Sequence, residues 1–434
     1  MSSPDLAASA SAISEPPAAS PGRILFASLI GTTIEFYDFY IYATAAVLVF
    51  PTLFFPGADP STASLQSLAT FAIAFFARPV GAALFGHFGD RVGRKATLVA
   101  ALMTMGLSTV AIGLLPSYAS VGVVAPALLC LFRLGQGIGL GGEWGGAVLL
   151  ATENAPPGKR AWYGMFPQLG APIGFLCSTA SFLILTYALS DEQFFAWGWR
   201  IPFVASAALV AVGLYVRLTI TETPAFRAVL EKHERVRVPI ASVIMSHAGA
   251  LALGTLGAMA TFTIFYLMTV FALSWGTSAL GYARSAFLPA QMVGVVFLGL
   301  AIPLSAIAAD RFGRERTLIL AALGVVAFGF LFEPLLVGGD LASVTLFLGL
   351  GLGLMGLTYG PLGAALAELF PAEVRYTGAS MTFNLAGILG ASPAPYVATY
   401  LAHAHGLAAV GWYLSAMGAL TALSLLLVAR LPRG

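Results

Sequence analysis

The chain is a succession of long apolar runs separated by short polar segments. Twelve runs hold roughly 20 or more mostly apolar residues, the length that a helix needs to cross the hydrocarbon core of a bilayer. They lack the strict apolar–polar alternation of membrane-barrel strands, so the pattern predicts helices. The predicted spans are 24–50, 65–86, 96–115, 122–152, 161–187, 200–220, 245–273, 284–308, 317–337, 342–367, 377–400 and 408–429.

Composition and charge support a membrane protein and predict its orientation. Only 9% of the 434 residues are charged and 59% are hydrophobic, whereas soluble domains carry about 25% charged residues. With the N-terminus inside, 17 of the 21 lysines and arginines fall in segments on the inner side, as the positive-inside rule requires. Both termini are therefore expected in the cytoplasm, with the inner (cytoplasmic) membrane as the location. The two cysteines, Cys130 and Cys177, lie inside apolar runs and are expected to be packing residues.

The chain repeats itself at about half its length. Gly86–Lys95 is a glycine-punctuated basic segment, predicted to be a loop after the second span. Its Asp-Arg-x-Gly-Arg order recurs from position 90 to position 310, a shift of 220 residues. Residues 153–160 and 368–375 form a second pair, 215 residues apart, after the fourth and tenth spans. Two repeats at equivalent positions indicate an internal duplication.

The duplication predicts an all-α membrane protein of two pseudo-symmetric six-helix bundles with a site between them, a transporter architecture. We do not expect a separate soluble domain, because the longest polar segment between spans is short, and we expect a monomer. The predicted division is a disordered cytoplasmic tail (1–22), an N-terminal bundle (23–220), a cytoplasmic linker (221–240), a C-terminal bundle (241–430) and a cytoplasmic tail (431–434).

Several motifs resemble one transporter family. Gly86–Lys95 resembles the signature of the major facilitator superfamily. Within it, residues 31–40 (GTTIEFYDFY), 76–79 (FARP), 133–137 (RLGQG), 141–144 (GGEW) and 222–226 (ETPAF) are similar to the metabolite:proton symporter family. Members of that family move shikimate, α-ketoglutarate, citrate, proline or betaine together with protons. The resemblance covers essentially the whole chain and implies proton-coupled uptake, without selecting the substrate.

Acidic residues within the spans are candidates for proton coupling, because charges inside a bilayer are costly and usually functional. Glu35, Asp38 and Tyr42 lie on one stripe of the first span, with Asp38 near its middle. Two carboxylates this close in a low dielectric disfavour double ionisation, so one is expected to carry the proton. Alternatively, one of them merely pairs with a fixed arginine. Glu143, nearer the inner end of the fourth span, is a further proton-site candidate.

Arg133 is the candidate anchor for a substrate carboxylate. It lies at a depth similar to that of Asp38, with Gln136 on the same helical face. Arginine keeps its proton, and its planar fork matches a carboxylate. A structural role as partner of Asp38 or Glu35 is the alternative, and both roles are compatible in different states. Further candidates for substrate contact, each of which could instead be a simple helix-contact residue, are Tyr37, Tyr42, Gln168, Tyr266, Gln291, Tyr359 and Asn384.

The repeated segments suggest a cytoplasmic gate. Asp90 and Asp310 could face helix N-termini across the two halves, where the helix dipole favours an anion. The arginines of the repeats could pair with nearby glutamates in a network that breaks as the halves rock. Positive-inside topology alone would explain the arginines but not the aspartate–glycine order. The predicted gate residues are Arg78, Asp90, Arg91, Arg94, Glu153, Arg160, Glu222, Asp310, Arg311, Arg314, Glu368 and Arg375, with Arg78 alternatively lining the inner cavity.

The sequence therefore predicts a proton symporter for a small organic solute, expected to be a carboxylate. A proton on Glu35 or Asp38 would release Arg133 to bind it. Spans of the second half carry almost no charge, which suggests charge recognition in the first half and shape selection in the second. No nucleotide loop, metal-ligand spacing or nucleophile–base constellation is present, so we expect no enzyme, cofactor, metal, nucleotide or nucleic-acid partner. The alternatives are a proton antiporter exporting a drug or metabolite, and a solute sensor without transport.

Overall fold

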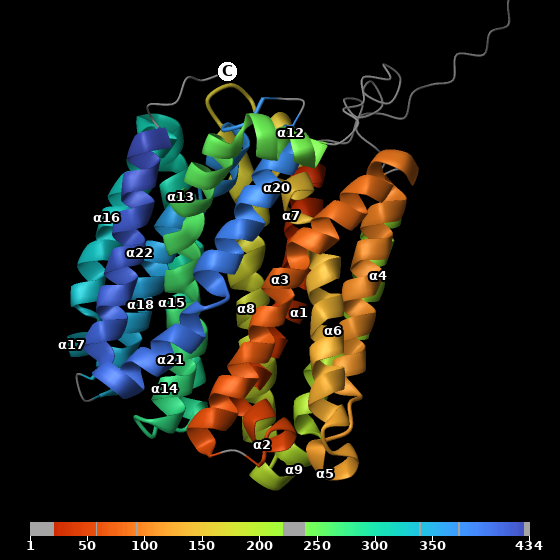
Figure 1. Cartoon of the computed structure of the whole chain (residues 1–434), viewed down its shortest axis with the longest axis vertical. Helices are drawn as coiled ribbons and strands as arrows, with labels where there is room; N and C mark the ends of the chain where they lie inside the picture. Colours follow the sequence, from red (N-terminus) through yellow and green to blue (C-terminus); the bar gives the residue numbers. More distant parts are fainter. Residues whose placement is uncertain are drawn as a thin grey trace, which may run out of the picture.

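The computed structural model describes residues 21–57, 59–92, 94–219, 239–337, 340–371 and 374–428. Within these ranges every regular element is a helix, as predicted. Figure 1 shows the helices side by side along the long axis, with the red-to-yellow helices of the first half next to the green-to-blue helices of the second. We call one end of this bundle the α12 end, after α12 (Pro239–Ser246), and the other the α9 end, after α9 (Asp191–Ala196).

Helices in the first half of the chain coincide with the six spans predicted there. Short helices lie in the connections between them: α2 (Phe50–Phe54), α5 (Tyr118–Val121), α9 and the 3-10 turn η1 (Gly198–Arg200). The long helices are α1 (Pro21–Leu48), α3 (Pro60–Val92), α4 (Arg94–Gly113), α6 (Val124–Leu140) with α7 (Trp144–Glu153), α8 (Arg160–Ala188) and α10 (Ile201–Thr219).

The second half is more interrupted than the first. Two of its predicted spans contain a π-helical turn, a rare element that is frequent at functional sites. These turns are η2 (Leu267–Phe271), between α13 (Ala248–Tyr266) and α14 (Ala272–Ser278), and η3 (Gly387–Ala391), between α20 (Arg375–Ala386) and α21 (Ala394–His405). The other helices are α15 (Arg284–Phe312), α16 (Arg314–Phe330), α17 (Phe332–Leu336), α18 (Leu341–Tyr359), α19 (Leu362–Ala367) and α22 (Leu407–Val428).

Eight helical stretches of the described chain are long and apolar enough to cross a membrane, judged by length and composition. They are Pro60–Phe85, Val124–Glu153, Arg160–Ala188, Gly198–Tyr215, Ala248–Ser278, Arg284–Phe312, Leu341–Ala367 and Leu407–Val428. The other four predicted spans coincide with α1, with α4, with α16 and α17, and with the run from α20 to α21. Helices therefore stand at all twelve predicted positions, and eight of them meet the criterion.

Polar and apolar side chains are distributed as lipid surroundings require. Leu304, Leu320 and Phe330 are each more than 60% exposed on the outside of the bundle, whereas Asp38 and Arg133 are at most 2% exposed inside it. Water would favour the reverse arrangement, but a hydrocarbon solvent favours apolar side chains outside and keeps charged groups in the interior.

The repeated segments are not the loops that we predicted. α3 continues to Val92 and α4 begins at Arg94, so Gly86–Lys95 is helical apart from position 93, which lies outside the described residues. The second copy ends α15 and turns at Gly313, whose φ is +99°. Glycine adopts such a φ without steric cost, which explains the glycine of this repeat. The prediction was wrong because it placed the end of the helix at the end of the apolar run. An apolar run ends at the membrane surface, but the backbone hydrogen bonds of a helix can continue beyond it.

Two glycines bring α6 close to its neighbours. A Cβ atom at Gly137 would lie 2.7 Å from the Cα of Ala74 on α3, and one at Gly139 would lie 2.7 Å from the Cβ of Met105 on α4. Real Cβ atoms do not make contacts this short, so only glycine permits the approach. The packing places Arg133, about one turn earlier on α6, in the interior of the first half.

Candidate functional site

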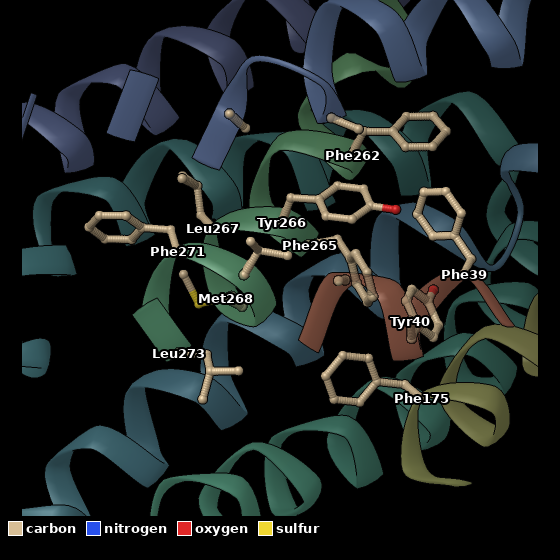
Figure 2. Close-up of a cluster of buried hydrophobic side chains, with 14 of the residues drawn as sticks. Phe39, Tyr40, Phe175, Phe262, Phe265, Tyr266, Leu267, Met268, Phe271 and Leu273 are labelled. Atoms are coloured by element: carbon tan, nitrogen blue, oxygen red, sulfur yellow. The ribbon is translucent and has the colours of Figure 1, made fainter. Parts of the chain in front are cut away.

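A narrow cavity lies between the two halves of the protein. Its volume is about 40 Å³, which is room for a few water molecules. Aromatic rings dominate this region: Figure 2 shows Tyr40 and Phe175 from the first half facing Phe265 and Tyr266 of α13, and the ring centroids of Tyr40 and Phe265 are 5.5 Å apart. The polar and charged residues of the wall are Thr32, Glu35, Tyr40, Arg78, Trp144, Thr261, Tyr266, Tyr359 and Asn384.

Glu35 and Arg78 are the charged residues among those that line the cavity. Both are buried, with 6% and 5% exposure. The guanidinium of Arg78 lies over the rings of Phe39 and Phe75, at 4.7 and 4.5 Å from their centroids. Among the described residues no carboxylate forms an ion pair with it, and its Nε has no hydrogen-bond partner.

Arg78 was predicted to belong to the cytoplasmic gate. It lies in the cavity wall, which was the alternative that the sequence left open. The reason is its distance along α3: Arg78 precedes Asp90 by twelve residues, or about 18 Å of helix at 1.5 Å per residue. This spacing separates Arg78 from Asp90 along the helix.

Asp38 lies behind the wall rather than in it. Its side chain is 2% exposed, and the Ser206 hydroxyl on α10 donates a hydrogen bond to its Oδ1 at 2.6 Å. Glu35 and Asp38 are thus close in sequence but differ in surroundings. Glu35 faces the cavity, whereas Asp38 faces α10 of the same half.

Arg133 is also sealed behind the wall. It is fully buried, and its Nη1 donates to Gln136 Oε1 at 2.9 Å while Nη2 donates to the Phe71 carbonyl at 3.4 Å. The guanidinium lies 3.9 Å from the centroid of the Tyr42 ring and 4.3 Å from that of Phe39. Arg133 and Gln136, the predicted substrate contacts, do not reach the cavity in this conformation.

Three other candidates of the first half are buried among neighbouring helices. The Tyr37 hydroxyl shares a hydrogen bond with Ser181 Oγ at 3.3 Å, and the Tyr42 hydroxyl shares one with Thr70 Oγ1 at 2.7 Å. Glu143 is 4% exposed at the junction of α6 and α7. The structure thus separates these three from the cavity wall.

Gln168 joins the two halves beside the cavity. Its Oε1 accepts from the indole N–H of Trp144 at 3.0 Å, and its Nε2 donates to the Tyr359 carbonyl at 3.3 Å. The Trp144 ring also stacks on Phe383 of α20, with centroids 3.6 Å apart and planes 11° from parallel. Neither stacked ring was among the predicted site residues. A tryptophan in a glycine-rich segment was the available signal, because a buried indole N–H needs a partner.

The second half supplies three of its four predicted contacts to the cavity wall: Tyr266, Tyr359 and Asn384. Asn384 also donates to the Gly141 carbonyl of the first half at 3.3 Å. Gln291 instead donates to two carbonyls of the π-helical turn η2, those of Met268 at 3.2 Å and Thr269 at 2.7 Å. Gln291 therefore supports an irregular backbone rather than the cavity wall.

Asp310 connects the halves near the α12 end. Its carboxylate accepts hydrogen bonds from the backbone N–H groups of Ala161 and Trp162, at 3.0 and 2.9 Å. These groups belong to the first turn of α8, where N–H groups have no partner within the helix and the dipole favours an anion. This is the geometry that we predicted for an aspartate of the repeat.

Other predicted gate residues take several positions. Glu368 pairs with Arg160 across the halves at 3.3 Å and also with Arg314. Arg375 donates to the Phe370 carbonyl of its own half at 3.1 Å. Glu153 and Arg311 are exposed. The side chains of Asp90, Arg91 and Arg94, and the whole of Glu222, lie outside the described residues.

Contacts across the halves also exist at the α9 end, where none was predicted. Arg284, at the start of α15, pairs with Asp191 of α9. Its guanidinium lies 4.6 Å from the centroid of the Phe194 ring. Polar contacts therefore join the halves at both ends, with the cavity enclosed between them.

Comparisons of the sequence connect it to known transporters. The sugar (and other) transporter family matches residues 24–241. The chain is 57% identical over 416 residues to the inner membrane metabolite transport protein YhjE of Escherichia coli K12, covering 95% of this chain and 94% of that protein. It is 35% identical to the shikimate transporter of the same organism, over 87% of each chain. Identity to the proline/betaine transporter of Salmonella typhimurium LT2 is 31%, over 87% of this chain and 77% of that one.

Solved structures show the same fold. XylE, a proton:xylose symporter of the major facilitator superfamily, was solved with 6-bromo-6-deoxy-D-glucose bound. It matches with a TM-score of 0.73 and 19% identity, over 93% of this chain and 94% of that chain. Another structure of a D-xylose–proton symporter matches with a TM-score of 0.71 and 20% identity, over 95% and 98%. Likeness at this identity establishes the fold alone.

Proposed function

We propose that this chain, which belongs to the sugar (and other) transporter family of the major facilitator superfamily, is a proton symporter for a small organic carboxylate. Membership of a transporter family shows that it is not an enzyme. Relatives with substantial identity are named as transporters of metabolites, of shikimate and of proline and betaine, and each of these three named solutes contains a carboxylate. YhjE is named an inner membrane protein, and we propose the same location here.

The proposal of a carboxylate substrate rests on the position of Arg78. A buried guanidinium is unfavourable unless its hydrogen-bond donors are satisfied. Within the described ranges this one has no carboxylate partner and an unsatisfied Nε, and it lines the cavity between the halves. Its planar fork can bind a carboxylate through two parallel hydrogen bonds. We therefore propose Arg78 as the substrate anchor in place of Arg133, which the wall covers. Because the cavity of about 40 Å³ is too small for such a solute, its aromatic wall has to open during binding.

For proton coupling we propose Asp38, the sealed carboxylate of α1, rather than Glu35 of the same helix. Glu35 lines the cavity beside the substrate anchor, whereas Asp38 is buried with a hydroxyl donor. Buried ionisable groups within membrane spans commonly form proton pathways. A proton moving inward gains about 2.3 kcal/mol per 100 mV of membrane potential, which can drive accumulation of the solute.

For alternating access we propose that the cross-half contacts at the two ends open in turn. The α12 end carries the Asp310 and Glu368 contacts. We assign this end to the cytoplasm, because the predicted inner segments hold most of the basic residues. The α9 end, with Arg284 and Asp191, would then face outward.

The test is transport in liposomes that contain a pH-sensitive dye, with shikimate, citrate, α-ketoglutarate, proline and betaine added in turn. We expect one carboxylate to acidify the interior, and we expect Arg78→Ala and Asp38→Asn to abolish the signal. Alkalinisation on solute entry would instead indicate an antiporter. Solute binding without entry would indicate a sensor. Uptake driven by sodium and insensitive to a pH gradient would reject proton coupling.

A further inference from the structure

Asp38 and Arg133 are two buried charges that do not touch. Both are at most 2% exposed, and in the described part of the chain neither forms an ion pair. An unpaired buried charge is unfavourable, so neutral polar groups must stabilise each of them. The arrangement of those polar groups determines whether the two charges can influence one another.

A line of buried polar side chains runs between them. Arg133 Nη1 donates to Gln136 Oε1 at 2.9 Å, and Gln136 Nε2 donates to Thr109 Oγ1 on α4 at 2.8 Å. The Thr109 hydroxyl lies within hydrogen-bonding reach of Asp38, which also accepts from Ser206. Gln136, Thr109 and Ser206 are at most 1% exposed, so the line is shielded from bulk water.

Hydrogen-bonding capacity fixes the direction of these bonds. Arginine has donors only, so Gln136 must turn its carbonyl oxygen to Arg133 and its amide group to Thr109. Thr109 therefore accepts from Gln136 and keeps one proton to donate. Two acceptors are available for that proton: the Asp38 carboxyl group and the Met105 carbonyl, which lies 3.0 Å from Thr109 Oγ1.

We infer that Gln136 and Thr109 are positioning residues that relay the protonation state of Asp38 to Arg133, an inference that builds on the proposed symport. When Asp38 is ionised, Thr109 donates to the carboxylate. When Asp38 binds a proton, it donates to Thr109, and Thr109 turns its own proton to the Met105 carbonyl. A hydroxyl has two acceptor sites, so Thr109 continues to accept from Gln136 in both states.

The two states differ in how strongly Gln136 is held. Hydrogen bonds in a chain polarise one another, so a hydroxyl that donates to an anion is a stronger acceptor than one that donates to a carbonyl. Ionised Asp38 thus strengthens the bonds from Thr109 through Gln136 to Arg133, and protonation weakens them. The titratable groups that face Asp38 in the described chain are Glu35 and Tyr37 of its own helix, while α4 and α10 contribute hydroxyls.

The same helix offers a matched control. Thr104 of α4 also carries a hydroxyl, but it donates to the Ala100 carbonyl of its own helix at 2.7 Å. Thr104→Val removes the same group as Thr109→Val without touching the line of polar side chains. If valine on α4 has a general effect, both variants will show it. If Thr109 acts as a relay, only Thr109→Val will change the state of Asp38.

The experiment is infrared difference spectroscopy between mildly acidic and neutral pH on the full chain in liposomes, without solute. The C=O stretch of protonated Asp38 is identified by its loss in Asp38→Asn. We expect Thr109→Val and Gln136→Leu to shift this band, the latter although no hydrogen bond joins Gln136 to Asp38. Thr109→Ser should restore the band, and Thr104→Val should leave it unchanged.

An unshifted band in both Thr109→Val and Gln136→Leu would overturn the relay, and so would the absence of any band that depends on Asp38. If Thr109→Val does not fold, the test is the position of the Asp38 band in Gln136→Leu compared with its position in Thr104→Val. In the dye assay the relay predicts that Thr109→Val lowers solute-driven proton influx about tenfold, the effect of one lost hydrogen bond to a charged group. Shifted bands without proton influx in the wild type would reject symport and leave the relay standing.

Discussion

Two pairs of charged residues in the first half look alike in sequence and differ in structure. The wall pair, Glu35 and Arg78, lines the cavity between the halves. The sealed pair, Asp38 and Arg133, lies behind that wall, where hydroxyl, amide and carbonyl groups hold it. The wall pair can meet a solute directly. The sealed pair can respond to a solute only through its neighbours, so the difference separates recognition from coupling.

The largest expected effect is at the wall pair. We predict that Arg78→Ala lowers the initial rate of solute uptake at least about 100-fold, because a hydrogen-bonded charged contact contributes roughly 1.5–3 kcal/mol and a bidentate contact more. Arg78→Lys keeps the charge but loses the fork and should fall in between. The measurement is uptake at matched amounts of protein in liposomes. Uptake by Arg78→Ala within threefold of wild type would show that the carboxylate binds elsewhere.

The next effect distinguishes the sealed pair from the wall pair. Asp38→Asn keeps an oxygen that accepts from Ser206 but cannot bind the coupling proton. We therefore expect loss of solute accumulation under a pH gradient, with exchange of labelled for unlabelled solute retained within about threefold. Glu35→Gln should instead raise KM, because Glu35 lines the cavity. An Asp38→Asn variant that still accumulates solute would place the proton on another residue.

The sequence could predict only part of the difference between the two pairs, because helix spacing contains limited information. Apolar runs located all twelve helical positions, and the rarity of charge identified Glu35, Asp38, Arg78 and Arg133 as candidates. Residues three apart on a helix share a stripe about 60° wide, so spacing could not tell that Glu35 faces the cavity and Asp38 faces α10. That distinction depends on which helix packs where.

Contacts between distant helices were the least predictable part of the site. Ser206, Thr109 and Phe383 are common residue types within apolar runs, and their partners lie on other helices. No pattern along one span identifies them. The asymmetry between the halves was better anticipated: charged groups of the wall come from the first half, and rings and an amide come from the second. The sequence suggested this from the lack of charge in the later spans.

A moderate effect is expected at Asp310, outside both pairs. Asp310→Asn weakens the charge-assisted bonds to the N–H groups of Ala161 and Trp162, and changes at helix N-termini typically amount to about 0.5–2 kcal/mol. We predict a two- to tenfold lower transport rate with unchanged solute affinity. Asp340→Asn is the control, because Asp340 caps α18 through Ser343 of its own half. Equal rates in both variants would deny Asp310 a role in the transport cycle.

The smallest effect is expected for Asp59 and Asp340, two exposed carboxylates outside the spans. A hydrogen bond from the Thr62 hydroxyl lowers the pKa of Asp59, and the backbone N–H of Ser343 lowers that of Asp340. A lowered pKa means that each carboxylate stabilises the fold above the usual aspartate pKa of about 3.9, and that this contribution is lost as the pH falls below it. Between pH 5 and 8 both groups stay ionised, so we predict that Asp59→Asn and Asp340→Asn leave the pH profile of transport within twofold of wild type. If the pH dependence of transport persists in Asp59→Asn and Asp340→Asn but disappears in Asp38→Asn, the coupling proton binds inside the bundle. If either Asp59→Asn or Asp340→Asn alters the pH profile, charges inside and outside the spans do not have separate roles.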